Sequence, residues 1–326
     1  MRFLKLAAAI VILIGMNVAI SCADEAHPTP SSTPTLTRHV FDGPDGPLDS
    51  TLPKFENRLE TEHFVLKWTN KSTYLPDNIK DPQIIKETAD YLETAWAKYA
   101  ELFGRTPYIP PGKDKVEVIF RDIDCYGFAD PPDGPIELSA GAWRDPKSSG
   151  IRRSTSAHEL FHKLQYAYGY KTKWKPQQPY KWFSEGTAAW AEVYVWGRVS
   201  RVGKVDDIFK DSSMDLYEAD DRAMPFWIYF VHGNEEHANN ALMRKFFEAC
   251  ERLQDENLAL KEVVEETYGP LDRFFQDFKK ERLTGFWRGP CETPYSCILG
   301  PDGNDLVQEV TNYLTRKTRN QKTGLF

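Results

Sequence analysis

The sequence predicts an α+β fold, in which an N-terminal subdomain holds a mixed β-sheet with a helix and a C-terminal subdomain is mostly helical. Two observations lead to this prediction. Segments typical of strands come first in the chain, and segments with helical spacing of apolar residues follow them. The chain has 326 residues, of which 41% are hydrophobic, and this is enough for a large buried core.

Strands and one long helix are expected in the first half of the chain. Residues 63–68 (HFVLKW) and 115–120 (KVEVIF) have the composition of strands. Between them, residues 83–103 place apolar side chains on one face of a helix. Residues 134–141 (GPIELSAG), which are bounded by Pro and Gly, indicate a third strand.

The second half of the chain is expected to consist of helices. Apolar residues recur at helical spacing in the ranges 154–168, 183–196, 222–232, 238–253, 258–268 and 271–284. A last helix is expected over residues 304–318.

The N-terminus has the pattern of a secretory signal peptide, residues 1–23. Arg2 and Lys5 precede an apolar run that is too short, and too soon followed by polar residues, for a convincing membrane span. Two ends fit the sequence: cleavage after Ala23, or a bacterial lipoprotein box in which Cys22 becomes the lipidated first residue. A retained N-terminal membrane anchor is the remaining alternative. We therefore expect an exported protein that is secreted, periplasmic or lipid-anchored at the bacterial cell surface.

Composition divides the rest of the chain into three parts. Residues 24–53 are rich in Pro, Thr and Ser, and such a segment buries too little apolar surface to offset the entropy of ordering it. We expect it to be a flexible linker. Residues 54–290 would form the folded domain, and residues 291–326 a C-terminal tail with a disulfide and a helix.

The cysteines that follow Cys22 are even in number, which suggests disulfides in an exported chain. Cys291 and Cys297 would close a short loop, and this leaves Cys125 to pair with Cys250. Free buried thiols are the alternative.

The charge of the chain argues against a nucleic-acid partner. The formal net charge is -7, and the sequence has no basic run that would neutralise phosphates. A lipid anchor at Cys22 would be the only link to a membrane.

The motif His-Glu-Leu-Phe-His, residues 158–162, predicts a zinc site on a helix. His158 and His162 lie four residues apart, so their side chains leave one side of the helix a turn apart and can bind one metal ion. Glu159 would lie close to the metal without binding it, where it can take a proton from a metal-bound water. The alternative is a solvated helix face that matches the motif by chance.

The next predicted helix supplies a third ligand. Glu185 would complete a set of two histidines and one carboxylate, which leaves the fourth position of the zinc ion open for water. Glu192 lies about two helical turns further on and therefore faces the same way. It can accept a hydrogen bond from a ligand imidazole and so fix its orientation. A surface carboxylate is the alternative for Glu192.

These two segments, HELFH and residues 182–192 (WFSEGTAAWAE), resemble the gluzincin zinc metallopeptidases, which include thermolysin-like and aminopeptidase N-like enzymes. Trp182, Glu185, Gly186 and Glu192 match a pattern of the aminopeptidase N-like branch. The chain is also similar, more weakly, to poorly characterised secreted bacterial peptidases of this group. The resemblance implies a thermolysin-like zincin fold with the zinc-binding helix at the cleft.

The resemblance also implies the roles of the site residues. His158, His162 and Glu185 would bind Zn²⁺, Glu159 would be the general base, and Glu192 would support a ligand histidine. The tyrosine that stabilises the oxyanion in this branch has Tyr217 as its best match, with Tyr229 and His232 behind it.

The family signature that anchors a substrate's amino terminus is absent from the sequence, and GPIELSAG (134–141) stands in its place. The sequence therefore favours an endopeptidase over an aminopeptidase. Because residues 134–141 precede the zinc helix, we expect this strand to form the rim of the cleft and to pair with an extended substrate.

The expected function is zinc-dependent hydrolysis of peptide bonds in a protein or peptide substrate, with residues 54–290 as the catalytic domain. Two alternatives remain open: a catalytically inactive gluzincin-like binding lipoprotein, and a surface protein with a structural zinc ion.

Overall fold

The structure, a computed structural model, describes most of the chain between residues 53 and 284. The described ranges are 53–145, 149–176, 178, 180–197, 216, 219–233 and 238–284. The signal peptide, residues 24–52 of the linker, Tyr217 and the C-terminal tail with Cys291 and Cys297 lie outside these ranges, so the predictions made for them stay predictions.

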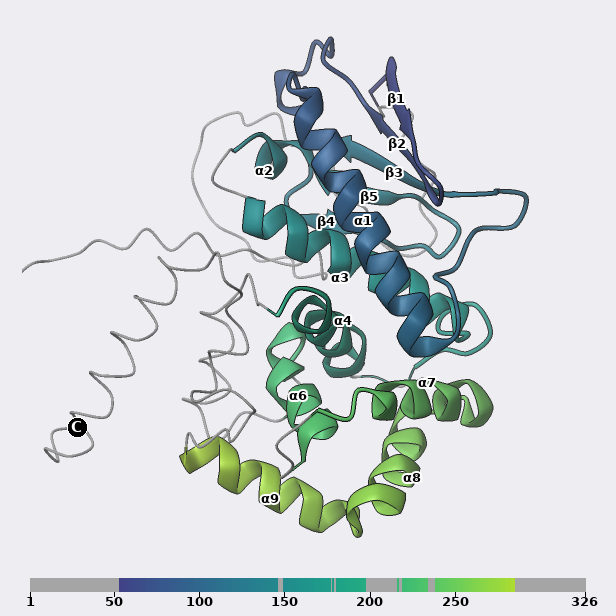
Figure 1. Ribbon diagram of the computed structural model, residues 1–326, viewed down its shortest axis with the longest axis vertical. Helices are drawn as coiled ribbons and strands as arrows, with labels where there is room; N and C mark the ends of the chain where they lie inside the picture. Colours follow the sequence, from purple (N-terminus) through teal and green to yellow (C-terminus); the bar gives the residue numbers. More distant parts are fainter. Residues whose placement is uncertain are drawn as a thin grey trace, which may run out of the picture.

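The fold is α+β, as predicted, with a five-stranded mixed sheet in one half and a group of helices in the other (Figure 1). The strands lie in the order β1-β2-β3-β5-β4. β2, β3 and β5 are parallel, while β1 and β4 pair antiparallel at the two edges. Their bounds are β1 Asn57–Glu60, β2 Phe64–Trp68, β3 Val116–Arg121, β4 Gly127–Phe128 and β5 Ile136–Ser139.

The predicted strand over 134–141 is present as β5, but its expected place at the rim of the cleft is wrong. β5 lies between β3 and β4, and all of its residues are buried. The edge on this side of the sheet is β4 instead. Since β4 has only two residues, it leaves no period-two pattern in the sequence that could have predicted it.

One long helix, α1 (Pro82–Phe103), packs against the sheet, and local sequence explains both of its ends. The side chain of Asp81 accepts a hydrogen bond from the backbone N–H of Gln83, and Pro82 stands at the first helical position. The helix ends at Gly104, whose φ of 61° is left-handed.

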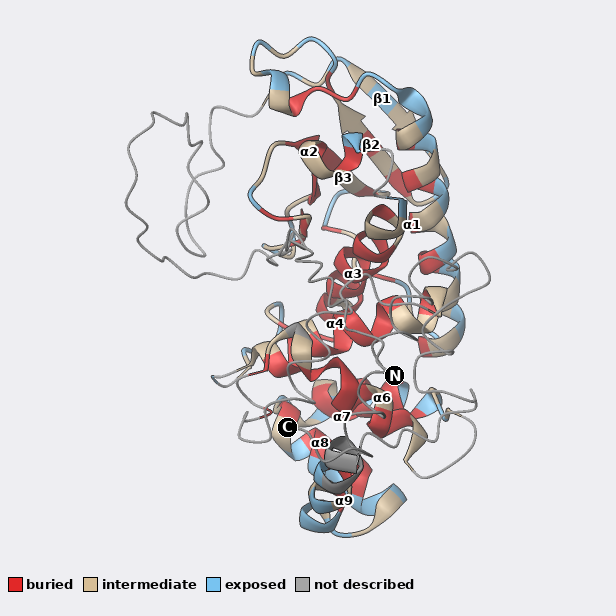
Figure 2. Cartoon of the chain, turned by 90° about the vertical axis from the view of Figure 1, so that its left-hand side faces the viewer, coloured by how far each residue is buried: buried red, intermediate tan, exposed pale blue. Residues whose placement is uncertain are grey.

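Two adjacent helices, α3 (Ser149–Ala167) and α4 (Lys181–Trp196), lie between the sheet and the C-terminal helices (Figure 1). Both are buried along most of their length (Figure 2). α3 begins five residues before the predicted start at 154. The helix before it, α2 (Ala140–Arg144), is short, and the sequence did not predict it.

The C-terminal half is helical, as predicted. The helices are α6 Met224–His232, α7 Ala241–Leu253, α8 Glu256–Tyr268 and α9 Leu271–Thr284. Each lies within a few residues of its predicted range. No helix in the described ranges combines the length and apolar character that crossing a lipid bilayer requires.

A single hydrophobic core joins the two halves, and Phe161 is fully buried in it. The ring of Phe161 lies 5.3 Å from that of Tyr99 on α1, 6.2 Å from that of Trp190 on α4 and 5.6 Å from that of Phe247 on α7. Replacing such a buried Phe by Ala costs about 3–5 kcal/mol. Since Phe161 lies between His158 and His162 in the sequence, this packing also fixes the helix that carries both histidines.

The predicted pairing of Cys125 with Cys250 is wrong. Cys125 takes part in a disulfide bond, whereas Cys250 is a free thiol. Cys250 is fully buried on α7 and fits the alternative of a buried thiol, which behaves as a small apolar side chain. Spacing along the chain could not distinguish these arrangements, because cysteine connectivity depends on the tertiary fold.

Candidate metal centre

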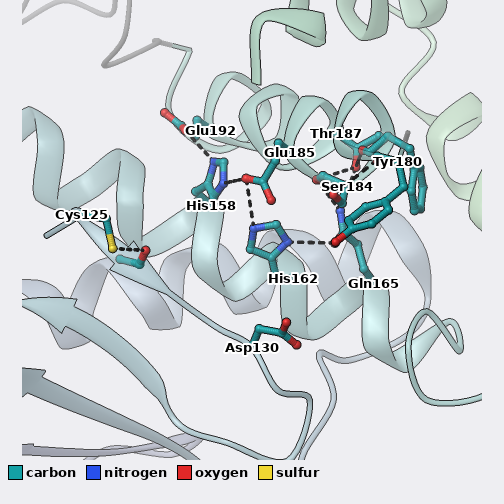
Figure 3. A network of polar contacts seen from close by, with 12 residues as sticks. Cys125, Asp130, His158, His162, Gln165, Tyr180, Ser184, Glu185, Thr187 and Glu192 are labelled. Carbon is teal, nitrogen blue, oxygen red and sulfur yellow. Dashed lines mark hydrogen bonds and ion pairs between the residues drawn. The ribbon is translucent and has the colours of Figure 1, made fainter. Parts of the chain in front are cut away.

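Two histidines of α3 and one glutamate of α4 come together where the helices pack side by side (Figure 3). One ligand atom from each of His158, His162 and Glu185 lies within 4.8 Å of the others. These are the three residues that the sequence predicts as metal ligands.

The two imidazoles face the same carboxylate oxygen. The Nε2 atom of His158 lies 3.2 Å from Oε2 of Glu185, and the Nε2 atom of His162 lies 3.7 Å from the same oxygen. A tetrahedral zinc ion with bonds of about 2.0–2.2 Å separates its ligand atoms by roughly 3.3–3.6 Å. The separations of the two imidazole nitrogens from the Glu185 oxygen are close to this range, so these contacts are compatible with a zinc ion bound by the three groups.

The orientation of His158 is fixed by Glu192. The Nδ1 atom of His158 lies 2.9 Å from Oε1 of Glu192, and both side chains are fully buried. Because a carboxylate accepts hydrogen bonds, Nδ1 is the atom that donates to Glu192, and Nε2 is the ring nitrogen that faces Glu185. The hydrogen bond expected for Glu192 is therefore present, and Glu192 is not a surface carboxylate.

His162 has an equivalent partner that the sequence analysis missed. Its Nδ1 atom lies 2.9 Å from Oε1 of Gln165, which is fully buried on the same helix. The spacing of three residues along a helix permits this contact. However, a glutamine on a helix usually only packs against its neighbours, so the sequence did not indicate that Gln165 contacts His162.

Glu159 follows His158 on α3 and lies against the edge of the sheet. It is 3% exposed and packs on Gly127 of β4. A Cβ atom on Gly127 would come within 2.6 Å of Cγ and 2.8 Å of Oε1 of Glu159. The backbone of β4 therefore lies directly on this carboxylate.

The electrostatics of the site favour an ionised Glu185. Burial raises the pKa of its carboxyl group, but His162 and His158 together outweigh this effect and bring the pKa well below its usual range. A deprotonated carboxylate is the form that binds a metal ion.

Lys163, the residue after His162, anchors the loop that leads from β4 to β5. Its ammonium group is buried and donates to the carbonyl oxygens of Pro132, at 2.9 Å, and Gly134, at 2.8 Å. Burial lowers the pKa of Lys163 to about 8, although nearby carboxylates act in the opposite direction. The loop is thus held against the helix that carries the histidines.

Asp130 belongs to the same loop, between β4 and β5. Its Oδ2 atom lies 2.6 Å from Nζ of Lys171, and its Oδ1 atom accepts a hydrogen bond of 3.3 Å from the hydroxyl group of Tyr166. The sequence analysis did not identify Asp130, since no motif marks it.

The oxyanion-stabilising tyrosine has no counterpart within the described ranges that the structure identifies. Tyr217, the predicted residue, lies outside them. Tyr229, the next candidate, is buried on α6 with its ring 5.0 Å from that of Phe274 and 5.4 Å from that of Phe278. The ring of Tyr229 therefore packs in the core.

No protein-family profile matches the chain, and the curated proteins include none with significant similarity to it.

Proposed function

We propose that the protein is a zinc-dependent peptidase of the gluzincin type, secreted or anchored at the cell surface, with a thermolysin-like zincin fold. The observation that carries the proposal is the convergence of three donors, the Nε2 atoms of His158 and His162 and the carboxylate of Glu185. Hydrogen bonds to both Nδ1 atoms leave the Nε2 lone pairs for the metal.

The donor set favours zinc in a catalytic role. Two imidazoles and one carboxylate suit Zn²⁺, and catalytic zinc sites have three protein ligands with a fourth position for water or substrate. Bound there, zinc would polarise the scissile carbonyl group and bring the pKa of a water molecule towards about 7.

Glu159 is the proposed general base. It follows His158 on α3, and its buried carboxylate is oriented by the packing of Gly127. It would take a proton from the attacking water and pass it to the leaving amine.

The proposed substrate is an extended peptide. β4 is an edge strand of the sheet within the described residues, and its backbone lies next to Glu159. A peptide that adds to this edge would place its backbone beside the base. This position replaces the one that the sequence analysis gave to residues 134–141.

A structural zinc site and an inactive binding protein are the competing proposals. Structural zinc sites usually have four protein ligands, often with cysteine. The group found among the described residues has three, and none is cysteine. An inactive protein would bind zinc in the same way, so activity has to separate it from the enzyme.

Two substitutions in the motif test the proposal. His158→Ala should remove zinc and activity together, because it deletes a ligand. Glu159→Gln should keep zinc but lower kcat by about 10²–10⁴-fold, because it removes the base and preserves its shape. Zinc content by mass spectrometry and digestion of a peptide library, with and without a chelator, provide the readouts. Zinc binding with no cleavage by the wild-type protein would favour a binding protein, and unchanged turnover in Glu159→Gln would refute the mechanism.

A further inference from the structure

Gln165 uses every hydrogen-bonding atom of its side-chain amide, and all of its partners are protein atoms. Its Nε2 atom donates to the carbonyl oxygen of Ser184, at 2.8 Å, and to the hydroxyl oxygen of Thr187, at 2.9 Å. Its Oε1 atom lies 2.9 Å from Nδ1 of His162. The side chain is fully buried and spans the space between α3 and α4.

These hydrogen bonds allow only one orientation of the Gln165 amide group. The carbonyl oxygen of Ser184 can only accept, so the nitrogen of the amide must face α4. Thr187 donates its own proton to the carbonyl oxygen of Phe183, at 2.7 Å, and can therefore accept from Gln165. The oxygen of the amide is left to face His162, whose Nδ1 atom must donate.

Two acceptors compete for the proton of a neutral His162. Oε1 of Gln165 lies at hydrogen-bonding distance from Nδ1, whereas Oε2 of Glu185 lies 3.7 Å from Nε2, too far for a hydrogen bond. With Gln165 in place, the proton is held on Nδ1. Without it, the proton would move to Nε2 beside Glu185 and would occupy the lone pair that a metal needs.

The same amide also links the two helices that carry the ligands. Its bond to Ser184 holds the residue that directly precedes Glu185 in the chain. One buried side chain therefore sets both the tautomer of His162 and the position of α4 next to it.

From this geometry we propose that Gln165 is a positioning residue of the metal site, which keeps the Nε2 lone pair of His162 directed at the ion. The inference rests on the proposed zinc site. It differs from the role of Glu192 because a neutral amide, unlike a carboxylate, adds no net charge to its imidazole.

Three variants separate this role from simple packing. Gln165→Met is close in size and has no hydrogen-bonding group comparable to an amide. The proton of His162 should then no longer be held on Nδ1. Gln165→Glu keeps an acceptor for Nδ1 but loses the donors to α4. Thr187→Val is the matched control, because it removes one contact of the amide with α4 and leaves the contact with His162.

The first readout is the protonation of His162 in metal-free protein, measured by histidine ¹⁵N NMR at a pH of about 9, above the ordinary imidazole pKa. The His162 signals are assigned by their loss in His162→Ala. We expect the proton on Nδ1 in the wild type, Gln165→Glu and Thr187→Val, and on Nε2 in Gln165→Met. A wild-type protein with its proton on Nε2 would overturn the inference, whether or not any variant folds.

The second readout is zinc affinity by competition with a chelator. Gln165→Met should bind zinc about 10–100-fold more weakly, Gln165→Glu should recover most of this loss, and Thr187→Val should stay close to the wild type. Equal losses in Gln165→Met and Thr187→Val would mean that Gln165 only packs. If the wild type binds no zinc, the proposed function fails, while the NMR result still decides the role of Gln165.

Discussion

Gly127 has no side chain, and this allows the backbone to approach Glu159, the residue that we propose as the general base. A Cβ atom at this position would lie 2.6 Å from Cγ of Glu159 and 2.7 Å from Cγ2 of Thr155, closer than such atoms approach in proteins. Glycine therefore lets the backbone of β4 lie on the carboxylate that we propose as the base. The neighbouring loop, anchored by Lys163, limits how far β4 can withdraw.

We predict that Gly127→Ala keeps zinc but impairs turnover. The added methyl group should displace the carboxylate of Glu159, and a misplacement of about 1 Å can cost about 10²-fold in rate. Zinc content and kcat with a peptide substrate measure the two effects. Gly150→Ala is the control, since a Cβ atom at that position of α3 meets nothing within 4 Å. Full activity in Gly127→Ala would show that the base tolerates this displacement.

At the scale of single residues, the sequence can predict the site residues that share one face of a helix, because their spacing along the chain reveals this. His158 and His162 lie about one turn apart, Glu185 and Glu192 lie about two turns apart, and the structure brings the four residues together. Gln165 and Gly127 could not be predicted in this way. The role of Gln165 depends on atoms of α4, and that of Gly127 on a two-residue strand from a distant part of the chain.

At the scale of elements, the packing of α4 against α6 determines where Glu185 lies. Gly186 is the contact point, because a Cβ atom there would come within 2.8 Å of Nε1 of Trp227 and 2.9 Å of Cβ of Ala223. Trp227 cannot easily move, since its Nε1–H donates to the carbonyl oxygen of Trp182 and its ring stacks on that of Trp182 at 5.4 Å.

We predict that Gly186→Ala destabilises the protein and weakens zinc binding, although alanine is the better helix former. The propensity gain is about 1 kcal/mol, whereas overpacking a core typically costs about 1–3 kcal/mol and would here push Glu185 away from the histidines. Urea unfolding of metal-free protein and chelator competition measure the two effects. Gly150→Ala should instead be neutral or stabilising. If Gly186→Ala gains stability as well, the contact with Trp227 is not a constraint.

The same scale explains which elements the sequence predicts. Long helices with wide apolar faces, such as α1 and α7, are found close to their predicted bounds. β1 and β4 are too short to carry a pattern, and β1 (NRLE) has a single apolar residue. Because the sequence does not predict β4, residues 134–141 were wrongly expected at the edge of the sheet.

At the scale of the whole molecule, the site lies where the sheet and the C-terminal helices meet. α3 and α4 are buried along most of their length between the two halves, and a single core extends through both (Figure 2). The order of strands and helices in the sequence predicted the α+β class. The disulfide partner of Cys125 could not be predicted in the same way, because cysteine connectivity depends on the tertiary fold.

The most direct test of the account is a crystal structure of the zinc-soaked protein with anomalous data collected at the zinc absorption edge. We predict one peak, about 2.0–2.2 Å from Nε2 of His158, Nε2 of His162 and a carboxylate oxygen of Glu185, with a solvent molecule as the fourth ligand. A peak at another place, a fourth ligand from the protein, or no peak at saturating zinc would contradict the catalytic metal site.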